Sequence, residues 1–397
     1  MVEAASATPR LVILDDYFPN IFTGFRVAEY TALLDAFPGA VVASASADFH
    51  RDHAVFARLH PEQAARVVPW QNSSLEGVGL AYLNFLNNAS AFLPSLEGAA
   101  VPFVFTLYPG GGLALDDQES DAKLRRVLAS PMLRAIVVTQ PVTMNVVRRL
   151  IGETGERSSP IEIAEITGGI ANSIYFDATL DRTWFGAGKS TLDVAFVAHK
   201  YMPRGRNKGF DVFVEAIEGL VARCSDDQRG SLRVHVVGNF DQSDWQECAG
   251  MSEFTANVVF HDLVETFALV ELMADFDVVV SPNVPFVLHP GNFDGFPTGC
   301  CLEGSLRGAV MMATDPLDLG TGLYEHEQTF IEIEPKAESV IEALLKLVAQ
   351  PARIKEIGLA GRNVSRRVFD PRVQVGGRVE VLRRQLIEVA ALPCEVP

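Results

Sequence analysis

The stretch LDVAFVAHKYMPRGRNKGFDVFVEAIEGLVAR, residues 192–223, contains a strand, a basic loop and a helix in succession. Residues 192–197 form a short apolar run that is typical of a parallel strand buried on both faces. The apolar residues after the loop recur at spacings of 3, 4 and 3, which predicts one stripe along a helix: Phe210, Phe213, Ile217 and Leu220. This order predicts an α/β fold with a parallel sheet.

The same alternation of apolar runs and amphipathic stretches recurs along all 397 residues. Six runs in the first half are predicted strands: 11–14, 40–45, 79–83, 102–107, 135–139 and 161–166. Six more follow in the second half: 192–197, 232–237, 257–260, 277–281, 309–313 and 329–333. Runs 161–166 and 329–333 carry alternating glutamates, so we expect edge strands there. We therefore predict two doubly wound Rossmann-like domains that face each other across a cleft at their strand carboxyl ends.

The domain boundaries follow from composition. The polar, glycine-bearing stretch 176–191 is interpreted as a flexible interdomain linker, which gives an N-terminal domain over 1–187 and a C-terminal domain over 188–371. Residues 372–397 form a C-terminal helix whose apolar stripe is Val375, Val379, Leu382, Leu386 and Val389. We expect its other face to be filled by Arg378, Glu380, Arg383, Arg384 and Glu388.

Charge and cysteine content exclude several classes of protein. The 33 Lys and Arg against 50 Asp and Glu give a net charge of −17, which argues against a general nucleic-acid binder or broad adhesion to anionic lipid. No run approaches the length of a membrane span and no signal peptide is visible. Five cysteines without metal-ligand spacing are interpreted as reduced thiols. We expect a cytoplasmic protein; peripheral association with a membrane is left open.

Two clusters carry the chemical signal. In residues 196–209 a predicted strand ends, and four cations follow within nine residues: Lys200, Arg204, Arg206 and Lys208. Lys208 stands at a helix start, where a cation is disfavoured by the helix dipole unless it faces a bound anion. The pattern fits a phosphate site and equally a solvated basic loop.

The second cluster is residues 292–304, NFDGFPTGCCLEG. Gly295 and Gly299 allow the backbone to approach a ligand closely. A helix is predicted to begin near Gly299, so that its free N–H groups point into the ligand site. Glu303 either stabilises the helix dipole or accepts hydrogen bonds from vicinal hydroxyls. Asp294 is the other carboxylate of this loop.

Three further motifs do not hold. Residues 186–191, GAGKST, lack the first glycine of a phosphate-binding P-loop and precede a strand instead of following one. Residues 108–112, YPGGG, lack the spacing of a nicotinamide site. Residues 275–277, DFD, stand where a helix gives way to a strand, so we expect capping and turn roles there.

Together these residues resemble family 4 retaining glycosyltransferases of the GT-B fold. The basic loop ending in Lys208-Gly-Phe-Asp211, the loop ending in Leu302-Glu-Gly304, and residues 234–238 and 274–282 resemble the family's donor domain in order and spacing. Residues 168–176 resemble the crossover between domains. The resemblance is strong over 190–370 and weaker over 1–189. It implies that the domain over 1–187 binds the acceptor, that the domain over 188–371 binds the nucleotide-sugar donor, and that the C-terminal helix crosses back to the first domain.

The resemblance implies a role for each matching position. Lys208 would contact the donor pyrophosphate, with Arg204 or Lys200 as the second cation and Arg204 preferred. Glu303 would bind the ribose hydroxyls and Asp294 the donor sugar. Tyr108 stands where a histidine is usual. The remaining donor-binding positions are Gly24, Gly295, Phe296, Pro297, Thr298 and Gly299.

The sequence also departs from the family. Asp294 and Glu303 are nine positions apart, where two glutamates eight apart are usual, and Phe25 replaces a second glycine after Gly24. Tyr108 keeps a hydroxyl but loses ready protonation near neutrality.

The resemblance implies a hexosyltransferase that uses a nucleotide-diphosphate sugar, with retention and with no cofactor or required metal. The acceptor could be a glycan, a lipid-linked glycan or a small molecule; the nucleotide, sugar and oligomeric state stay open. One alternative is a sugar-nucleotide epimerase of the same fold, with His289, His261 and Asp16 as candidate groups. The other is a catalytically weak sugar-nucleotide-binding subunit.

Overall fold

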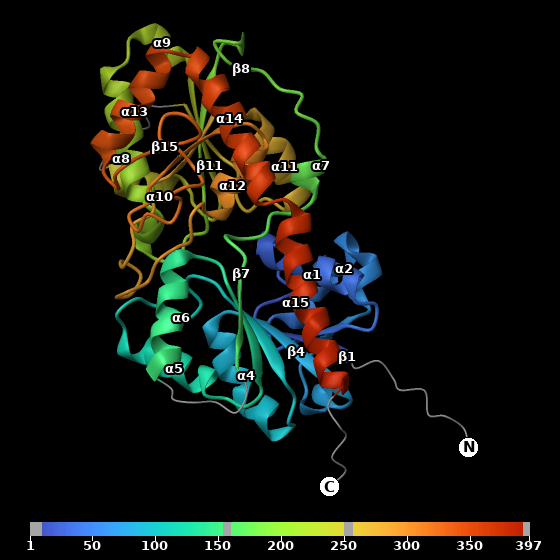
Figure 1. Cartoon of the computed structure of the whole chain (residues 1–397). Helices are drawn as coiled ribbons and strands as arrows, with labels where there is room; N and C mark the ends of the chain where they lie inside the picture. The colour runs from blue at the N-terminus through green and yellow to red at the C-terminus, as the bar shows by residue number, and fades with distance from the viewer. Residues whose placement is uncertain (1–9, 154–159, 250–256, 392–397) are drawn as a thin grey trace, which may run out of the picture. The chain divides into compact units, whose positions relative to one another are not determined.

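The computed structural model describes residues 10–153, 160–249 and 257–391. The chain divides into two compact units. Unit 1 combines the residues up to Ile170 with those from Pro371 onward, and unit 2 runs from Ala171 to Asp370. Each is an α/β unit built on its own parallel sheet (Figure 1).

Unit 1 is built on a seven-stranded parallel sheet in the order β3-β2-β1-β4-β5-β6-β7. Its strands are β1 (Arg10–Asp15), β2 (Val41–Ser44), β3 (Val67–Pro69), β4 (Val78–Asn84), β5 (Phe103–Leu107), β6 (Leu133–Val138) and β7 (Glu162–Glu165). Its helices are α1 (Gly24–Ala36), α2 (Phe49–Leu59), α3 (Pro61–Ala64), η1 (Asn72–Leu75), α4 (Leu86–Gly98), α5 (Gln118–Leu128), α6 (Pro141–Glu153) and α15 (Pro371–Ala391).

Unit 2 has a six-stranded parallel sheet in the order β12-β11-β10-β13-β14-β15, and a small β8-β9 pair. The strands are β8 (Trp184–Phe185), β9 (Gly188–Lys189), β10 (Leu192–Val197), β11 (Leu232–Val237), β12 (Val258–Phe260), β13 (Val278–Ser281), β14 (Val310–Ala313) and β15 (Ile331–Glu332). The helices are α7 (Ile174–Asp177), η2 (Pro203–Lys208), α8 (Phe210–Arg223), α9 (Asp226–Ser231), α10 (Gln242–Ala249), α11 (Thr266–Asp275), α12 (Gly299–Leu306), α13 (Ala337–Ala349) and α14 (Ala352–Val368).

The predicted strands are confirmed in both units, and β7 and β15 are edge strands as expected. The short edge strand β3 was not predicted, because three residues give too little periodicity to detect. In unit 2 the predicted helical stripe of α8 is fully buried and packs against β10 and α13. Burying one such large apolar side chain contributes about 1.5–3 kcal/mol, so this stripe anchors the helix that follows the basic loop.

The interpretation of residues 176–191 as a flexible linker is wrong, because this stretch is tied to unit 2. Arg182 donates to the carbonyl oxygens of Phe276 (2.8 Å) and Arg307 (3.1 Å). The ammonium of Lys189 lies 2.8 Å from the fully buried Asp277 carboxylate. Asp277 therefore forms ion pairs with Arg182 and Lys189 instead of capping a helix. The predicted domain boundary at 187/188 falls inside unit 2.

The C-terminal helix α15 belongs to unit 1, where it contacts α1 and β4 (Figure 1). Its apolar stripe packs on the unit-1 core through Val375, Val379, Leu382 and Leu386. The prediction for Arg378 is wrong: this side chain is fully buried instead of lying on a polar outer face. Its guanidinium lies 3.3 Å from the Glu29 carboxylate and donates to the Tyr108 hydroxyl at 2.9 Å. A buried charge needs such partners, and α1 and the end of β5 supply them.

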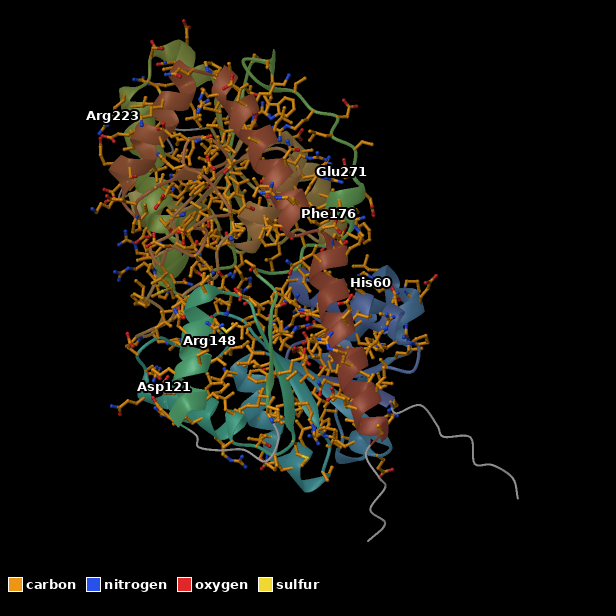
Figure 2. All side chains as sticks on the ribbon, viewed as in Figure 1. His60, Asp121, Arg148, Phe176, Arg223 and Glu271 are labelled. Atoms are coloured by element: carbon orange, nitrogen blue, oxygen red, sulfur yellow. The ribbon has the colours of Figure 1, made fainter. Side chains whose placement is uncertain are left out.

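Arg223 lies at the surface at the end of α8 (Figure 2), and it pairs with the exposed Glu338 of α13. Four cysteines are free thiols in the part of the chain that the structure describes, and Cys394 lies outside it. Among the described residues no helix is long and apolar enough to cross a membrane.

Candidate functional site

Two loops at the carboxyl ends of neighbouring strands in unit 2 are fastened to each other. Gly209, at φ 71°, ends the loop after β10, and a Cβ there would lie 2.0 Å from the carbonyl oxygen of Pro282, just after β13. The backbone N–H of Val284 donates to the carbonyl oxygen of Asn207 at 3.1 Å. The close approach requires a glycine, and it brings the basic loop against the loop that precedes α12.

The centre of this arrangement is an ion pair between two predicted site residues. The Lys208 ammonium lies 2.8 Å from Oδ1 of Asp294, and Asn283 donates to Oδ2 of the same carboxylate at 2.7 Å. Burial lowers the pKa of Lys208, but the charge of Asp294 outweighs it, so the net pKa is raised. Lys208 is therefore a permanent cation held beside a carboxylate.

The amino end of α12 lies beside this pair. The helix begins at Gly299, as predicted, and the Thr298 side chain makes no capping hydrogen bond to it. The Thr298 hydroxyl instead lies 3.1 Å from the Ser281 hydroxyl and 3.3 Å from the Cys300 sulfur. Within the described residues, the N-cap side chain thus leaves the first backbone N–H groups of α12 without a cap, which suits an anionic or polar ligand.

Glu303 lies in the second turn of α12, one turn later than a dipole-stabilising carboxylate would stand, and it is only partly exposed. Desolvation by burial, followed by the nearby Cys300, raises the pKa of its carboxyl to about 8. The buried Tyr175 hydroxyl lies close enough to this carboxyl to interact with its charge. Its geometry does not meet the criteria for a hydrogen bond to any described residue. Near pH 7 Glu303 is largely protonated, so it can both donate and accept a hydrogen bond.

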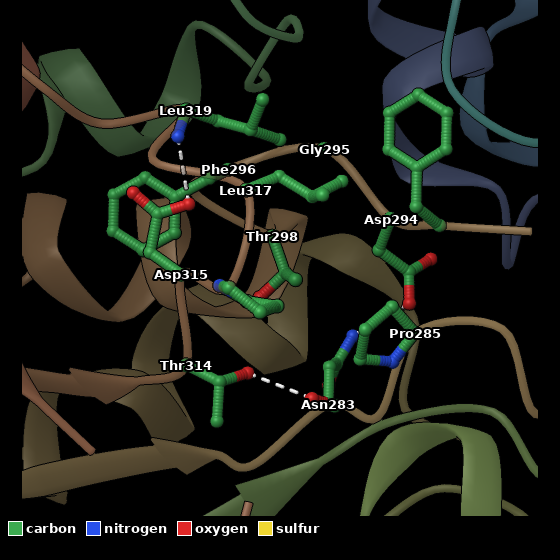
Figure 3. A pocket seen from close by; sticks show the side chains of 12 residues that line it. Asn283, Pro285, Asp294, Gly295, Phe296, Thr298, Thr314, Asp315, Leu317 and Leu319 are labelled. Atoms are coloured by element: carbon green, nitrogen blue, oxygen red, sulfur yellow. Dashed lines mark hydrogen bonds between the residues drawn. The ribbon is translucent and has the colours of Figure 1, made fainter. Parts of the chain in front are cut away.

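A pocket opens next to Asp294 (Figure 3). Its wall includes the predicted residues Gly295, Phe296 and Thr298, and its other lining residues are Asn283, Pro285, Phe293, Asp294, Thr314, Asp315, Pro316, Leu317 and Leu319. Asp315 shapes the opposite wall by accepting hydrogen bonds from the backbone N–H groups of Leu319 (2.9 Å) and Gly320 (2.7 Å). Pro297 lies between two lining residues in the chain.

The other predicted cations point to a different part of unit 2. The Lys200 ammonium binds both carboxylate oxygens of Asp244 on α10, at 2.8 and 2.9 Å. Arg204 interacts with the Cys248 thiol on the same helix. The structure thus brings Lys208 to the α12 loop and leaves Lys200 and Arg204 beside α10.

The two predicted site residues of the first domain lie in unit 1. Gly24 is the first residue of α1. Tyr108 is nearly buried, and its hydroxyl accepts from Arg378 at 2.9 Å and donates to Glu29 at 3.1 Å. These partners occupy the hydroxyl, so the catalytic role of Tyr108 stays a prediction.

The two histidines among the epimerase candidates have different surroundings in unit 2. Nε2 of His261 lies 2.9 Å from Nδ1 of the nearly buried His235, whose Nε2 lies 2.7 Å from Asp193. His289 is exposed, and its Nδ1 faces the Pro290 carbonyl oxygen. Asp16 belongs to unit 1.

Sequence reasoning missed Asn283, Asp315 and Tyr175 as contributors to the site. Asn283 and Asp315 each follow a strand end, which is a usable signal. Tyr175 gives none, because it comes from a short helix far from Glu303 in sequence. In the described parts of the chain, no group of three or more His, Cys, Asp or Glu side chains could hold a metal ion.

Comparison with known proteins agrees with this geometry. Residues 193–350 match the family described as glycosyl transferases group 1. No curated protein matches the chain significantly.

Solved structures match over nearly the full chain. A glycosyltransferase from Rickettsia africae ESF-5 has a TM-score of 0.67 at 14% identity, covering 96% of this chain and 99% of its own. Anabaena Alr3699/HepE, solved in complex with UDP, has 0.64 at 15%, covering 94% and 100%. Sucrose-phosphate synthase (tll1590) from Thermosynechococcus elongatus has 0.59 at 14%, covering 96% and 99%. The chain therefore has the GT-B fold of glycosyltransferases.

Proposed function

We propose that the protein is a retaining glycosyltransferase that moves a hexose from a nucleotide-diphosphate sugar to an acceptor hydroxyl. The observation that carries the proposal is the Lys208–Asp294 pair, 2.8 Å apart, beside the uncapped amino end of α12. A cation and free backbone N–H groups fit a diphosphate, and a carboxylate beside them fits sugar hydroxyls. The match of residues 193–350 to glycosyl transferases group 1 supports the same reaction.

In this proposal the donor's diphosphate is the leaving group. Lys208 and the amides of Gly299 and Cys300 stabilise the negative charge that develops on it, since preorganised donors stabilise a transition state without reorganising. Asp294 then accepts hydrogen bonds from the donor sugar while it still orients Lys208. Glu303 binds the ribose hydroxyls, and the walls near Phe296 and Thr298 enclose the donor.

The acceptor hydroxyl attacks the anomeric carbon on the face that the diphosphate leaves, and its proton passes to the departing phosphate. The carbon–oxygen bond to the diphosphate breaks as the new glycosidic bond forms, so configuration is retained. Arg204 or Lys200 would supply the second cation after a side-chain rearrangement away from α10. Gly24 would lie near the donor phosphates, and residues 108–112 would shape the acceptor side.

The decisive experiment compares Lys208→Ala with Lys346→Ala, a lysine on α13 of the same unit that pairs with Glu327. UDP and UDP-glucose are the first probes, because Anabaena Alr3699/HepE was solved with each of them; GDP- and dTDP-sugars follow. We expect Lys208→Ala to weaken nucleotide-sugar binding in calorimetry about tenfold or more, the worth of one charge-assisted hydrogen bond. Lys346→Ala should bind as the wild type does.

Product analysis separates the alternatives. Transfer to an added acceptor, with the donor's anomeric configuration kept in the product by NMR, supports the proposal. Isomerisation of the nucleotide sugar without acceptor identifies an epimerase, and binding without turnover across an acceptor panel identifies a binding subunit. Equal binding by Lys208→Ala and the wild type contradicts the donor assignment.

A further inference from the structure

The loop after β1 in unit 1 is fixed by one buried carboxylate. Asp15 is fully buried and accepts hydrogen bonds from the backbone N–H groups of Tyr17 (2.8 Å) and Phe18 (2.6 Å). The same side chain also accepts from Tyr30 of α1 at 2.7 Å and from Asn88 of α4 at 3.2 Å. The loop that carries Tyr17 is therefore held in one conformation at the carboxyl end of a central strand.

Three aromatic rings of unit 1 surround the guanidinium of Arg26. Its central carbon lies 5.5 Å from the ring centroid of Tyr17, 5.4 Å from that of Phe25 and 4.7 Å from that of Phe85. Nε of Arg26 is 3.1 Å from the Asp15 carboxylate, so its charge is already balanced. The guanidinium thus holds the three rings in place through cation–π contacts. Because Asp15 already balances its charge, it attracts a further anion only weakly.

The backbone beneath these rings is strained. Phe85 follows β4 with φ 69°, a region that bulky residues rarely adopt. A Cβ on Gly111 would lie 2.3 Å from the Phe85 ring, and one on Gly112 would lie 2.1 Å from the amide oxygen of Asn87. A glycine loop therefore folds closely over Phe85 and Asn87, and strain of this kind concentrates at ligand sites.

The same edge exposes apolar rings and hydrogen-bond acceptors together. Tyr17 and Phe22 are 44% and 47% exposed, unusually high for large rings in unit 1. The carboxylate of Asp16, next to Tyr17, is 54% exposed. We call Tyr17, Phe22, Phe25 and Phe85 the aromatic platform.

We propose that the aromatic platform binds a neutral carbohydrate as the acceptor, an inference that rests on the proposed glycosyl transfer. The apolar C–H face of a sugar ring packs on aromatic rings, and its hydroxyls donate to acceptors such as Asp16. An anionic acceptor is disfavoured because Arg26 is neutralised, Asp16 is exposed and the chain carries −17 overall. A lipid chain would leave the Asp16 carboxylate desolvated against hydrocarbon.

The test uses the full chain and measures saccharide binding without any nucleotide sugar. Maltose, cellobiose and lactose are titrated by saturation-transfer NMR, with 4-nitrophenol and glycerol phosphate as probes of other chemistry. Tyr17→Ala and Phe22→Ala each remove an exposed ring, so folding is not at risk. Phe267→Ala, on α11 of unit 2 and 45% exposed, is the matched control.

We expect at least one neutral disaccharide to bind, and each platform variant to weaken it roughly five- to tenfold, the worth of one stacked ring. Phe267→Ala should change nothing. Binding of 4-nitrophenol or glycerol phosphate in preference to every disaccharide overturns the proposal, as does binding that Tyr17→Ala and Phe22→Ala leave unchanged, or no disaccharide binding. Nucleotide-sugar binding that depends on Lys208 would in each of these cases leave the proposed function standing.

Discussion

Replacing Arg378 tests whether a buried ion pair fastens the C-terminal helix to unit 1. Arg378 and Glu29 are both fully buried, 3.3 Å apart, and the Tyr108 hydroxyl bridges them. Arg378→Met keeps much of the side-chain volume but leaves Glu29 as a buried carboxylate without its cation. Breaking such a pair costs about 3–5 kcal/mol, a large fraction of the roughly 5–15 kcal/mol that stabilises a typical folded protein.

The double variant Glu29→Gln with Arg378→Met separates the pair from its packing. It removes both charges, so we expect it to recover at least about 2 kcal/mol relative to Arg378→Met alone, a coupling typical of residues in one network. Arg384→Met is the matched control on the same helix. Arg384 pairs with Glu162 at the surface, where an ion pair contributes about 0–1 kcal/mol.

The assay is urea unfolding followed by circular dichroism, together with hydrogen exchange of peptides from α15 and β4. Because the two units can unfold separately, exchange assigns the loss to unit 1. The UDP-sugar binding that we propose for unit 2 serves as an internal check and should be preserved. A loss below about 1 kcal/mol for Arg378→Met, or a double variant no more stable than the single one, would refute the reasoning.

Three further predictions concern unit 2. Thiol alkylation should label Cys300 ahead of the other described cysteines, because the hydrogen bond from Cys301 and the charge of Lys208 lower the pKa of its thiol. UDP-sugar should protect Cys300 from labelling, and mass spectrometry of the labelled peptides checks both expectations. The pKa of Glu303 in the folded protein is about 8, above its ordinary value of 4.5, so unfolding between these pH values releases a proton. The thermal stability of the wild type relative to Glu303→Gln should therefore fall as the pH rises from about 4.5 to about 8. Gly209→Ala should weaken nucleotide-sugar binding tenfold or more in calorimetry, since its Cβ forces the loops apart; wild-type affinity would contradict the close approach.

Predictions from the sequence succeed where the signal is local. Short apolar runs predicted all the strands of the six-stranded sheet in unit 2 but not the small β8-β9 pair, and glutamate alternation marked the edge strands β7 and β15. The start of α12 at Gly299 was also predicted, because glycine, proline and threonine cluster there and favour a loop before the helix. Each of these signals acts within a few residues, so no knowledge of the rest of the fold is needed.

Whether a polar side chain is buried, and which group it pairs with, depended on residues that are distant in the chain. Arg378 was expected among the charged residues of an outer helix face, yet it is buried, because α1 and β5 present Glu29 and Tyr108 to it. Lys200 and Lys208 look equivalent in the basic loop, but Lys200 pairs with Asp244 and Lys208 with Asp294.

The sequence by itself therefore determined the α/β fold, most of its strands and the two loops to which we assign the donor chemistry. Only the tertiary structure decided which cation of the basic loop meets the α12 loop, and which polar side chains are buried. The physical reason is that periodicity and backbone preference are local, whereas burying a charge is tolerated only where the fold brings a complementary group to it. The aromatic platform illustrates the same division. Tyr17 follows β1, Phe25 lies in α1 and Phe85 follows β4, and these three rings meet around Arg26 only in the folded unit.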